Sequence, residues 1–228
     1  MARGSPELRA RASEWTAAEK LRYLQERNVG DCVRCVLCKT RRNIVFGVGD
    51  PEADLMFIGE APGADEDRQG IPFVGRAGQR LTRWIEWLGM RREQVYIANV
   101  LKCRPPNNRD PRPPEVAKCS PFLHAQIRAI QPRVIVALGR HAGNLLLQSQ
   151  RPLSLSRMRG RALRFEQRQA GIALPMVVTY HPSYVLRRES EEMRQARGRL
   201  NGPSRAEQAV HADLRIAMQA LRTQQPPS

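Results

Sequence analysis

Four apolar runs alternate along the chain with segments that have helical spacing. The runs occupy residues 54–59, 94–101, 133–139 and 174–180, and in each the central residues are apolar without alternating polar positions. Strands in which apolar and polar residues do not alternate are typical of a parallel sheet that helices cover on both faces. The pattern therefore predicts an α/β fold with a parallel sheet at its centre.

Helical spacing between the runs supports this interpretation. In residues 77–90 the large apolar side chains recur at the interval of a helical face. Further helices are expected from about Pro114, over 140–148 and over 203–222. With neither an internal repeat nor a linker, the sequence predicts one domain at 29–222, preceded by an N-terminal helical arm (1–28) and followed by a tail (223–228).

Polar residues follow three of the four predicted strands. Ligands of parallel α/β sheets bind at the carboxyl ends of the strands, so the residues after each strand are the first candidates for a site. They are Glu60, Asn99, Gly139 and His181. Three of these four carry groups that can bind a heterocycle.

Composition narrows the class of partner. The 228 residues are 41% hydrophobic, no apolar run approaches the ~18 residues that span a bilayer, and the N-terminus lacks the apolar segment of a secretory signal. We therefore expect a cytoplasmic protein without a membrane partner, and a monomer. The formal net charge of +16 favours a polyanion, with nucleic acid first.

Five cysteines in such a chain favour a metal site over disulfides. Cys32 and Cys35 form one pair, and Cys103 and Cys119 follow from a second segment. Cys38 makes a second CxxC pair with Cys35, so the spacing leaves the first pair ambiguous. Four thiolates suit zinc or an iron–sulfur cluster equally well at this stage. The flanking Pro-rich and basic loops indicate a structural role.

Three longer motifs have a recognisable family character. "GEAPGADEDRQGIPFVGRAGQ" (59–79), "YIANVLKCRPPNNRDP" (96–111) and "TYHPSYVLR" (179–187), together with the four cysteines, closely resemble family 4 uracil-DNA glycosylases. The resemblance covers roughly residues 30–190. It implies an α/β/α sandwich around a four-stranded parallel sheet, uracil-containing DNA as partner, and removal of uracil to leave an abasic site. It also implies a [4Fe–4S] cluster on Cys32, Cys35, Cys103 and Cys119, with Cys38 free.

The resemblance assigns roles in a pocket for a base flipped out of the duplex. Phe73 would stack on uracil, Asn99 would read its O4 and N3–H edge, and Glu66 would lie near C5 and exclude the thymine methyl group. His181 would donate a hydrogen bond to O2 and stabilise the departing anion. Glu60 would position water or stabilise the cationic sugar, or instead brace the turn from Ala61 to Gly63, whose N–H groups would contact O2. Asp65 and Asp67 are expected in solvent.

Contacts to DNA are expected from two basic segments. Leu186 would fill the gap left by the flipped base, with Ser183 and Arg187 beside it at the backbone. Arg157 and Arg159, within an Arg-rich segment, would follow the phosphates. Two alternatives stay open: a non-catalytic zinc- or cluster-containing nucleic-acid-binding module, and a glycosylase that accepts a broader set of deaminated bases.

Overall fold

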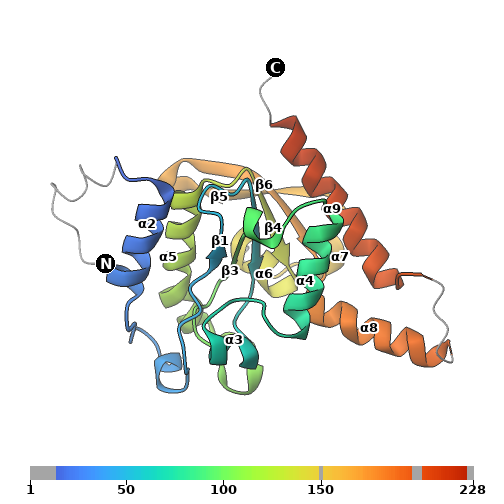
Figure 1. Cartoon of the computed structure of the whole chain (residues 1–228), viewed down its shortest axis with the longest axis horizontal. Coiled ribbons are helices and arrows are strands. Elements are labelled where there is room, and N and C mark those ends of the chain that lie inside the picture. The colour runs from blue at the N-terminus through green and yellow to red at the C-terminus, as the bar shows by residue number, and fades with distance from the viewer. Residues whose placement is uncertain (1–13, 149–150, 197–201, 225–228) are drawn as a thin grey trace.

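Six strands form a single sheet with the order β1-β3-β2-β4-β6-β5 in this computed structural model, which describes residues 14–148, 151–196 and 202–224 (Figure 1). The strands are β1 (Val48–Gly49), β2 (Leu55–Gly59), β3 (Tyr96–Asn99), β4 (Val134–Leu138), β5 (Ala162–Gln167) and β6 (Ile172–Thr179). The four inner strands are the four that the apolar runs predict, and they pair in parallel.

The expected four-stranded, wholly parallel sheet is wrong at both edges, where β1 and β5 pair antiparallel with their neighbours. β1 has only two residues, so its sequence carries too short a signal to detect. β5 has one fully buried residue, Phe165, because an edge strand needs little apolar surface. A tight connection joins β5 to β6 and ends at Gly171, whose φ of +64° is in the left-handed region.

Helices cover both faces of the sheet, so the α/β/α layering is confirmed. The α-helices are α2 (Ala17–Tyr23), α3 (Ala64–Gln69), α4 (Arg76–Trp87), α5 (Pro113–Ile130), α6 (Arg140–Leu147), α7 (Leu155–Met158), α8 (Pro182–Gln195) and α9 (Arg205–Thr223). Short π or 3-10 turns are η1 (Leu24–Val29), η2 (Val36–Lys39), η3 (Arg92–Gln94), η4 (Pro106–Asn108) and η5 (Arg168–Ala170). Figure 1 shows α2 and α5 on one side and α4, α8 and α9 on the other.

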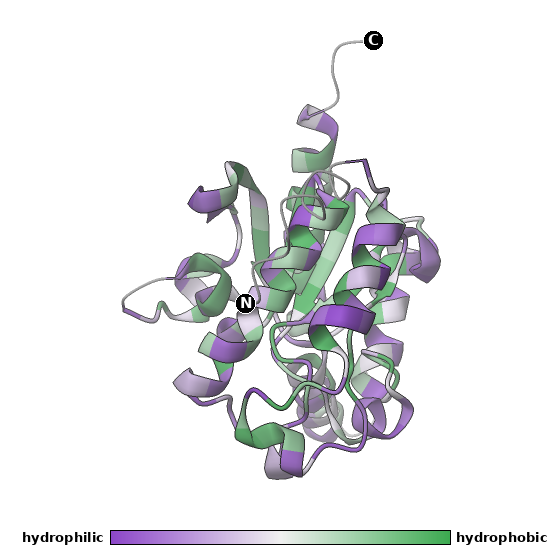
Figure 2. Cartoon of the chain, turned by 90° about the vertical axis from the view of Figure 1, so that its left-hand side faces the viewer, coloured by the Kyte–Doolittle hydropathy of each residue, from purple (hydrophilic) through white to green (hydrophobic). Residues whose placement is uncertain are grey.

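Alternate residues of each inner strand feed two separate cores. In β2, Met56 and Ile58 pack with residues of α2, α5 and α6, whereas Leu55 and Phe57 pack with residues of α4, α8 and α9. All four are fully buried. In Figure 2 the hydrophobic colour is concentrated on the strands and on the helix faces toward them. This two-sided burial explains why the strands are continuously apolar.

The described part of the predicted N-terminal arm packs on this fold. Leu21 and Leu24 are buried in the core cluster that contains α5. The division into arm, domain and tail stays a prediction, since residues 1–13 and 225–228 lie outside the described residues. Among the described helices, none is both long enough and apolar enough to cross a membrane.

Candidate active site

The predicted site residues meet at the carboxyl edge of the parallel strands. Gly59 at the end of β2 pairs in register with Asn99 at the end of β3. Across the sheet, the Gly139 N–H after β4 donates to the Thr179 carbonyl at the end of β6 (2.9 Å). The register therefore brings together the four chain segments that follow the inner strands, as the parallel topology requires.

Asn99 carries a buried acceptor with no partner. Its side chain is 1% exposed, and no described group donates a hydrogen bond to its Oδ1. Gly59 lies directly beneath: a Cβ built there would overlap Asn99 Oδ1 and would lie 2.6 Å from Phe73 Cζ. Asn99 and Phe73 are therefore neighbours over a glycine, and an unpaired buried oxygen of this kind is costly unless a ligand donor satisfies it.

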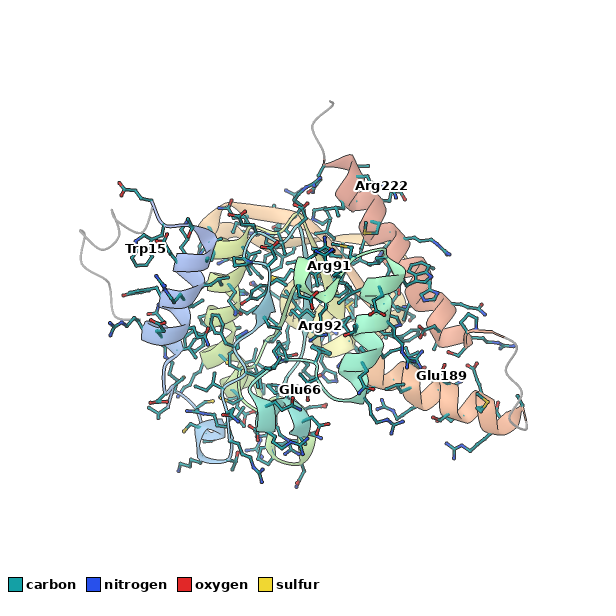
Figure 3. All side chains as sticks on the ribbon, in the orientation of Figure 1. Trp15, Glu66, Arg91, Arg92, Glu189 and Arg222 are labelled. Carbon is teal, nitrogen blue, oxygen red and sulfur yellow. The ribbon has the colours of Figure 1, made fainter. Side chains whose placement is uncertain are left out.

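Phe73 has an unusual backbone conformation that the loop holds in place. Its φ is +53°, which is strained for a residue with a side chain. The Glu66 carboxylate accepts from the N–H groups of Val74 and Gly75 (both 3.0 Å) directly after Phe73. Its other oxygen accepts from Gly63 N–H (3.1 Å). Glu66, on α3 (Figure 3), thus ties two loops together.

Through its contact with Gly63, Glu66 also braces the turn after β2. Glu66 holds Gly63, a role the sequence offered to Glu60, while Ala61 lies half-buried beside the core. The expectation that Asp67 is a solvated charge is wrong: it is 3% exposed and accepts from Arg42 N–H at 2.9 Å. A buried carboxylate is tolerated there because backbone donors compensate its lost hydration.

His181 is the N-cap of α8, followed by Pro182 at the first helical position. Its Nδ1 accepts the Ser183 backbone N–H (3.2 Å), so in the neutral ring the proton is on Nε2. Burial, with a smaller contribution from Arg187, lowers the pKa of His181 to about 4. His181 is therefore a neutral donor at pH 7. Its ring centroid lies 5.9 Å from that of Phe73.

Glu60 lies in a cluster that the sequence did not reveal. One carboxylate oxygen of Glu60, one of Asp110 and a ring nitrogen of His141 all lie within 4.8 Å of one another. His141 Nε2 is 3.6 Å from Asp110 Oδ2 and 3.3 Å from Arg140 Nη2. Burial raises the pKa of Glu60; Asp110 raises it further, whereas His141 and Arg140 oppose the shift.

His141 and Asp110 were recoverable in principle. His141 stands only two residues beyond Gly139, the residue named after the third predicted strand, and Asp110 follows β3 within the Pro-rich loop. Neither residue is among the four strand-end candidates. His141 nevertheless lies in the first turn of α6, and that turn also lies at the carboxyl edge of the sheet.

Four cysteines line one small cavity between the η1–η2 segment, the loop after β3, and α5. They are Cys32, Cys35, Cys103 and Cys119. Cys38, on η2, does not line this cavity. Arg41 approaches the site, with Nη1 2.6 Å from the Cys32 carbonyl and 3.6 Å from Cys103 Sγ. The fold therefore brings together four soft donors from distant segments.

A basic groove of about 470 Å³ runs beside His181 between the start of α4 and α8. The residues that line it are Arg76, Ala77, Ser183, Leu186, Arg187, Ser190, Glu191 and Arg194. All three residues predicted here for DNA contact are thus in one groove. Arg187 Nη1 lies 3.4 Å from Ser183 Oγ, and Leu186 is half-buried.

The two predicted contacts from the Arg-rich segment differ in accessibility. Arg157, on α7, is exposed. Arg159 is engaged inside the protein: its Nε donates to Asp213 Oδ2 (2.7 Å), and its guanidinium lies 4.1 Å from the centre of the Tyr180 ring. Its side chain is 16% exposed. Arg159 is therefore a structural ion-pair partner in this conformation.

Comparison with known proteins agrees with this geometry. The profile of the uracil DNA glycosylase superfamily matches residues 46–201. A type-4 uracil-DNA glycosylase of Archaeoglobus fulgidus is 48% identical over 164 residues, covering 71% of this chain and 81% of the relative. One from Thermotoga maritima is 44% identical over 180 residues, covering 79% and 90%.

More distant similarity is shorter. A type-5 uracil-DNA glycosylase of Pyrobaculum aerophilum is 36% identical over 115 residues, which cover 44% of this chain and 50% of that protein. The profile match covers more than half of the chain, and the two type-4 relatives are matched over most of their own length. This chain belongs to the uracil DNA glycosylase superfamily.

Proposed function

We propose that this chain removes uracil from DNA by hydrolysing the bond between N1 of the base and C1′ of the deoxyribose, which leaves an abasic site. The observation that carries the proposal is the buried, unpartnered Oδ1 of Asn99 beside the ring of Phe73. A flipped base enters between these groups, stacks on the ring and supplies the missing donor.

Asn99 selects uracil over cytosine. Its Oδ1 accepts N3–H of uracil while its amide nitrogen donates to O4. Cytosine presents an acceptor at N3 and a donor at N4, so both contacts become mismatched and the buried groups stay unpaired. Sites that read hydrogen bonds in this way discriminate strongly, because an unpaired buried group carries its full desolvation cost.

Glu66 guards the C5 side through the backbone that it holds. Its three N–H contacts fix Gly63 and the residues after Phe73. The wall of the pocket is then rigid where thymine carries its methyl group, so thymine is excluded by overlap. Ala61 and Gly63 form the facing turn toward O2.

His181 stabilises the leaving group. As the glycosidic bond breaks, negative charge develops on uracil O2, and the neutral Nε2–H of His181 donates to it. The low pKa of His181 fits this role. The neutral ring can donate its Nε2–H without gaining a proton first, and it keeps that proton during the reaction. A preorganised donor in a dry site stabilises charge more than water does.

Glu60 acts on the sugar side. A carboxylate at the end of β2 stabilises positive charge at C1′ and orients the water that attacks it. Asp110 and His141 set its charge state from the neighbouring loop and helix.

The four cysteines of the cavity fit a [4Fe–4S] cluster. All four donors are soft and come from the N-terminal segment, the loop after β3 and α5. When bound, the cluster would cross-link the N-terminal segment, the loop after β3 and α5.

The basic groove gives the DNA its path. Leu186 would enter the gap left by the flipped base, and Ser183 and Arg187 would bind the adjoining phosphates. Arg76 at the start of α4 and Arg194 on α8 also line the groove, and Arg157 offers a further exposed cation.

The test is a single-uracil oligonucleotide incubated with the protein and then treated with alkali, which cleaves abasic sites. Strand scission is expected for uracil and not for matched cytosine or thymine strands, and an Asn99→Ala variant should lose it. A protein that retains its visible absorbance and leaves the uracil strand intact would refute the proposal. That result would favour a nucleic-acid-binding module without catalysis.

A further inference from the structure

A fully buried lysine lies between the reading residue and the cysteine site. Lys102 is 1% exposed, and its side chain is among the largest that are fully buried among the described residues. Its Nζ donates to the backbone carbonyl of Asn99 (2.8 Å) and to Gln126 Oε1 on α5 (2.6 Å). Its own N–H donates to Cys119 Sγ (3.2 Å). One residue thus contacts both sites.

The remaining contacts leave Lys102 little freedom. Its carbonyl accepts the Val45 N–H (2.8 Å), and Gln126 donates in turn to the Phe46 carbonyl (3.0 Å). Lys102 also lines the cavity that the four cysteines form. Burying an ammonium group is costly, and the reaction described above uses no lysine. A buried charge with such partners is best explained by the geometry that it imposes.

We propose that Lys102 is a positioning residue that couples the cysteine site to uracil recognition by holding the Asn99 backbone while its own backbone is held by Cys119. The inference rests on the proposed function, because it assigns the reading of uracil to Asn99.

The coupling has a direct physical route. The Asn99 carbonyl belongs to the peptide that ends β3. The position of this peptide sets the direction in which the side-chain amide of Asn99 points. Movement of Cys119, the sulfur that accepts the Lys102 N–H, shifts the backbone from which Nζ reaches back to that carbonyl. Misplacement of a positioning group by ~1 Å can lower the reaction rate by up to about 100-fold.

Thermodynamic linkage gives the proposal a second consequence. If the state of the cysteine site changes the affinity for uracil, uracil must change the stability of the cysteine site by the same factor. Bound uracil should therefore lower the fraction of the cluster that a chelator removes at equilibrium. This readout does not depend on catalysis.

The test compares Lys102→Met with Glu207→Gln, a matched buried polar change. Glu207 accepts from Trp84 Nε1 (2.7 Å) in the opposite core and touches neither site. Free uracil binding is measured by calorimetry, and cluster loss is followed by visible absorbance with and without uracil. Lys102→Met should bind uracil at least about tenfold more weakly and lose the protection by uracil, whereas Glu207→Gln should retain both.

Wild-type affinity and wild-type protection in a folded Lys102→Met protein would overturn the inference, as would equal losses in Glu207→Gln. If Lys102→Met does not fold, Gln126→Met removes one anchor of Nζ and should weaken uracil binding less but in the same direction; no change there also overturns it. Absence of both uracil binding and strand scission at uracil in the wild-type protein would mean that the proposed function has failed, not the coupling.

Discussion

The rings of Phe73 and His181 lie 5.9 Å apart, centroid to centroid, with their planes inclined at 38°. The two residues are 108 positions apart in the chain, in the loop after β2 and at the start of α8. Their proximity places an aromatic face beside a hydrogen-bond donor. Substitution of Phe73 is therefore expected to remove the stacking contact alone, and substitution of His181 the hydrogen-bond donor alone.

Adding one methyl group at Gly59 should weaken uracil binding. In Gly59→Ala the new Cβ overlaps Asn99 Oδ1 and lies 2.6 Å from Phe73 Cζ. Displacing both should reduce uracil affinity by about 100-fold or more while the core stays folded. Calorimetric binding and thermal unfolding check this. Gly160→Ala, where nothing lies within 4 Å of the added Cβ, should keep wild-type affinity, whereas its φ of +74° strains the alanine and should lower the melting temperature.

Removing the His181 donor should slow the chemical step. His181→Ala is expected to lower kcat by about 10²–10³ with a smaller effect on KM, because the contact strengthens only as charge develops on O2. Single-turnover kinetics measure this. Since the pKa of His181 is about 4, the wild-type rate should have no limb near pH 6.5 from this residue.

The same pKa predicts a pH dependence of stability. The unfolded state, with a histidine pKa of about 6.5, binds more protons than the folded state between pH 6.5 and 4. The free energy of unfolding should fall as pH decreases through that window. His181→Asn should remove this component; an unchanged dependence would contradict the burial assigned to the ring.

Two substitutions around Glu60 should move the acid limb of kcat/KM in opposite directions. Burial raises the pKa of Glu60, so the limb should lie above the ordinary glutamate range. Asp110→Asn removes a group that raises this pKa and should move the limb to lower pH. His141→Asn removes a group that lowers it and should move the limb higher. Shifts in the same direction would exclude electrostatic control by the cluster.

Substitution of Arg187 should affect DNA binding, whereas substitution of Arg159 should affect the stability of the fold. Arg187→Ala should weaken DNA binding and reduce the slope of log K against log salt by about one phosphate contact. Arg159→Ala should leave that slope unchanged and lower the free energy of unfolding by about 3 kcal/mol, because Asp213 is left buried without its partner. Salt-titrated binding and denaturant unfolding distinguish the two.

Replacing a cysteine that lines the cavity should remove the cluster, whereas replacing Cys38 should not. Cys119→Ser is expected to remove the visible absorbance and lower the melting temperature, since one of the four donors is lost. Cys38→Ser should retain both, because Cys38 does not line the cavity. Iron content measured on the purified proteins tests the assignment. Loss of iron in Cys38→Ser would place the fourth donor there instead.

The sequence by itself determined the four inner strands, their parallel arrangement and the candidates at their carboxyl ends. A strand that is buried on both faces has a run of apolar residues. Such runs are typical of parallel sheets, so the local pattern predicts the parallel arrangement. Asn99 and His181 were found in the same way, because a strand end is visible in the sequence. The cysteine spacing indicated a metal site, and the motif resemblance added Phe73 and selected Cys32, Cys35, Cys103 and Cys119 from the five cysteines.

Only the tertiary structure decided how the polar groups pair. Asp67 is buried and Arg159 is tied to Asp213, although both look like solvated charges in the sequence. Edge strands β1 and β5 escaped detection because they bury few side chains. Partners such as Lys102 and Gln126, or Glu60 and His141, come from different elements, and their distances depend on how those elements pack. Hydrogen bonding and desolvation act at a few ångströms, a scale that residue spacing along the chain does not specify.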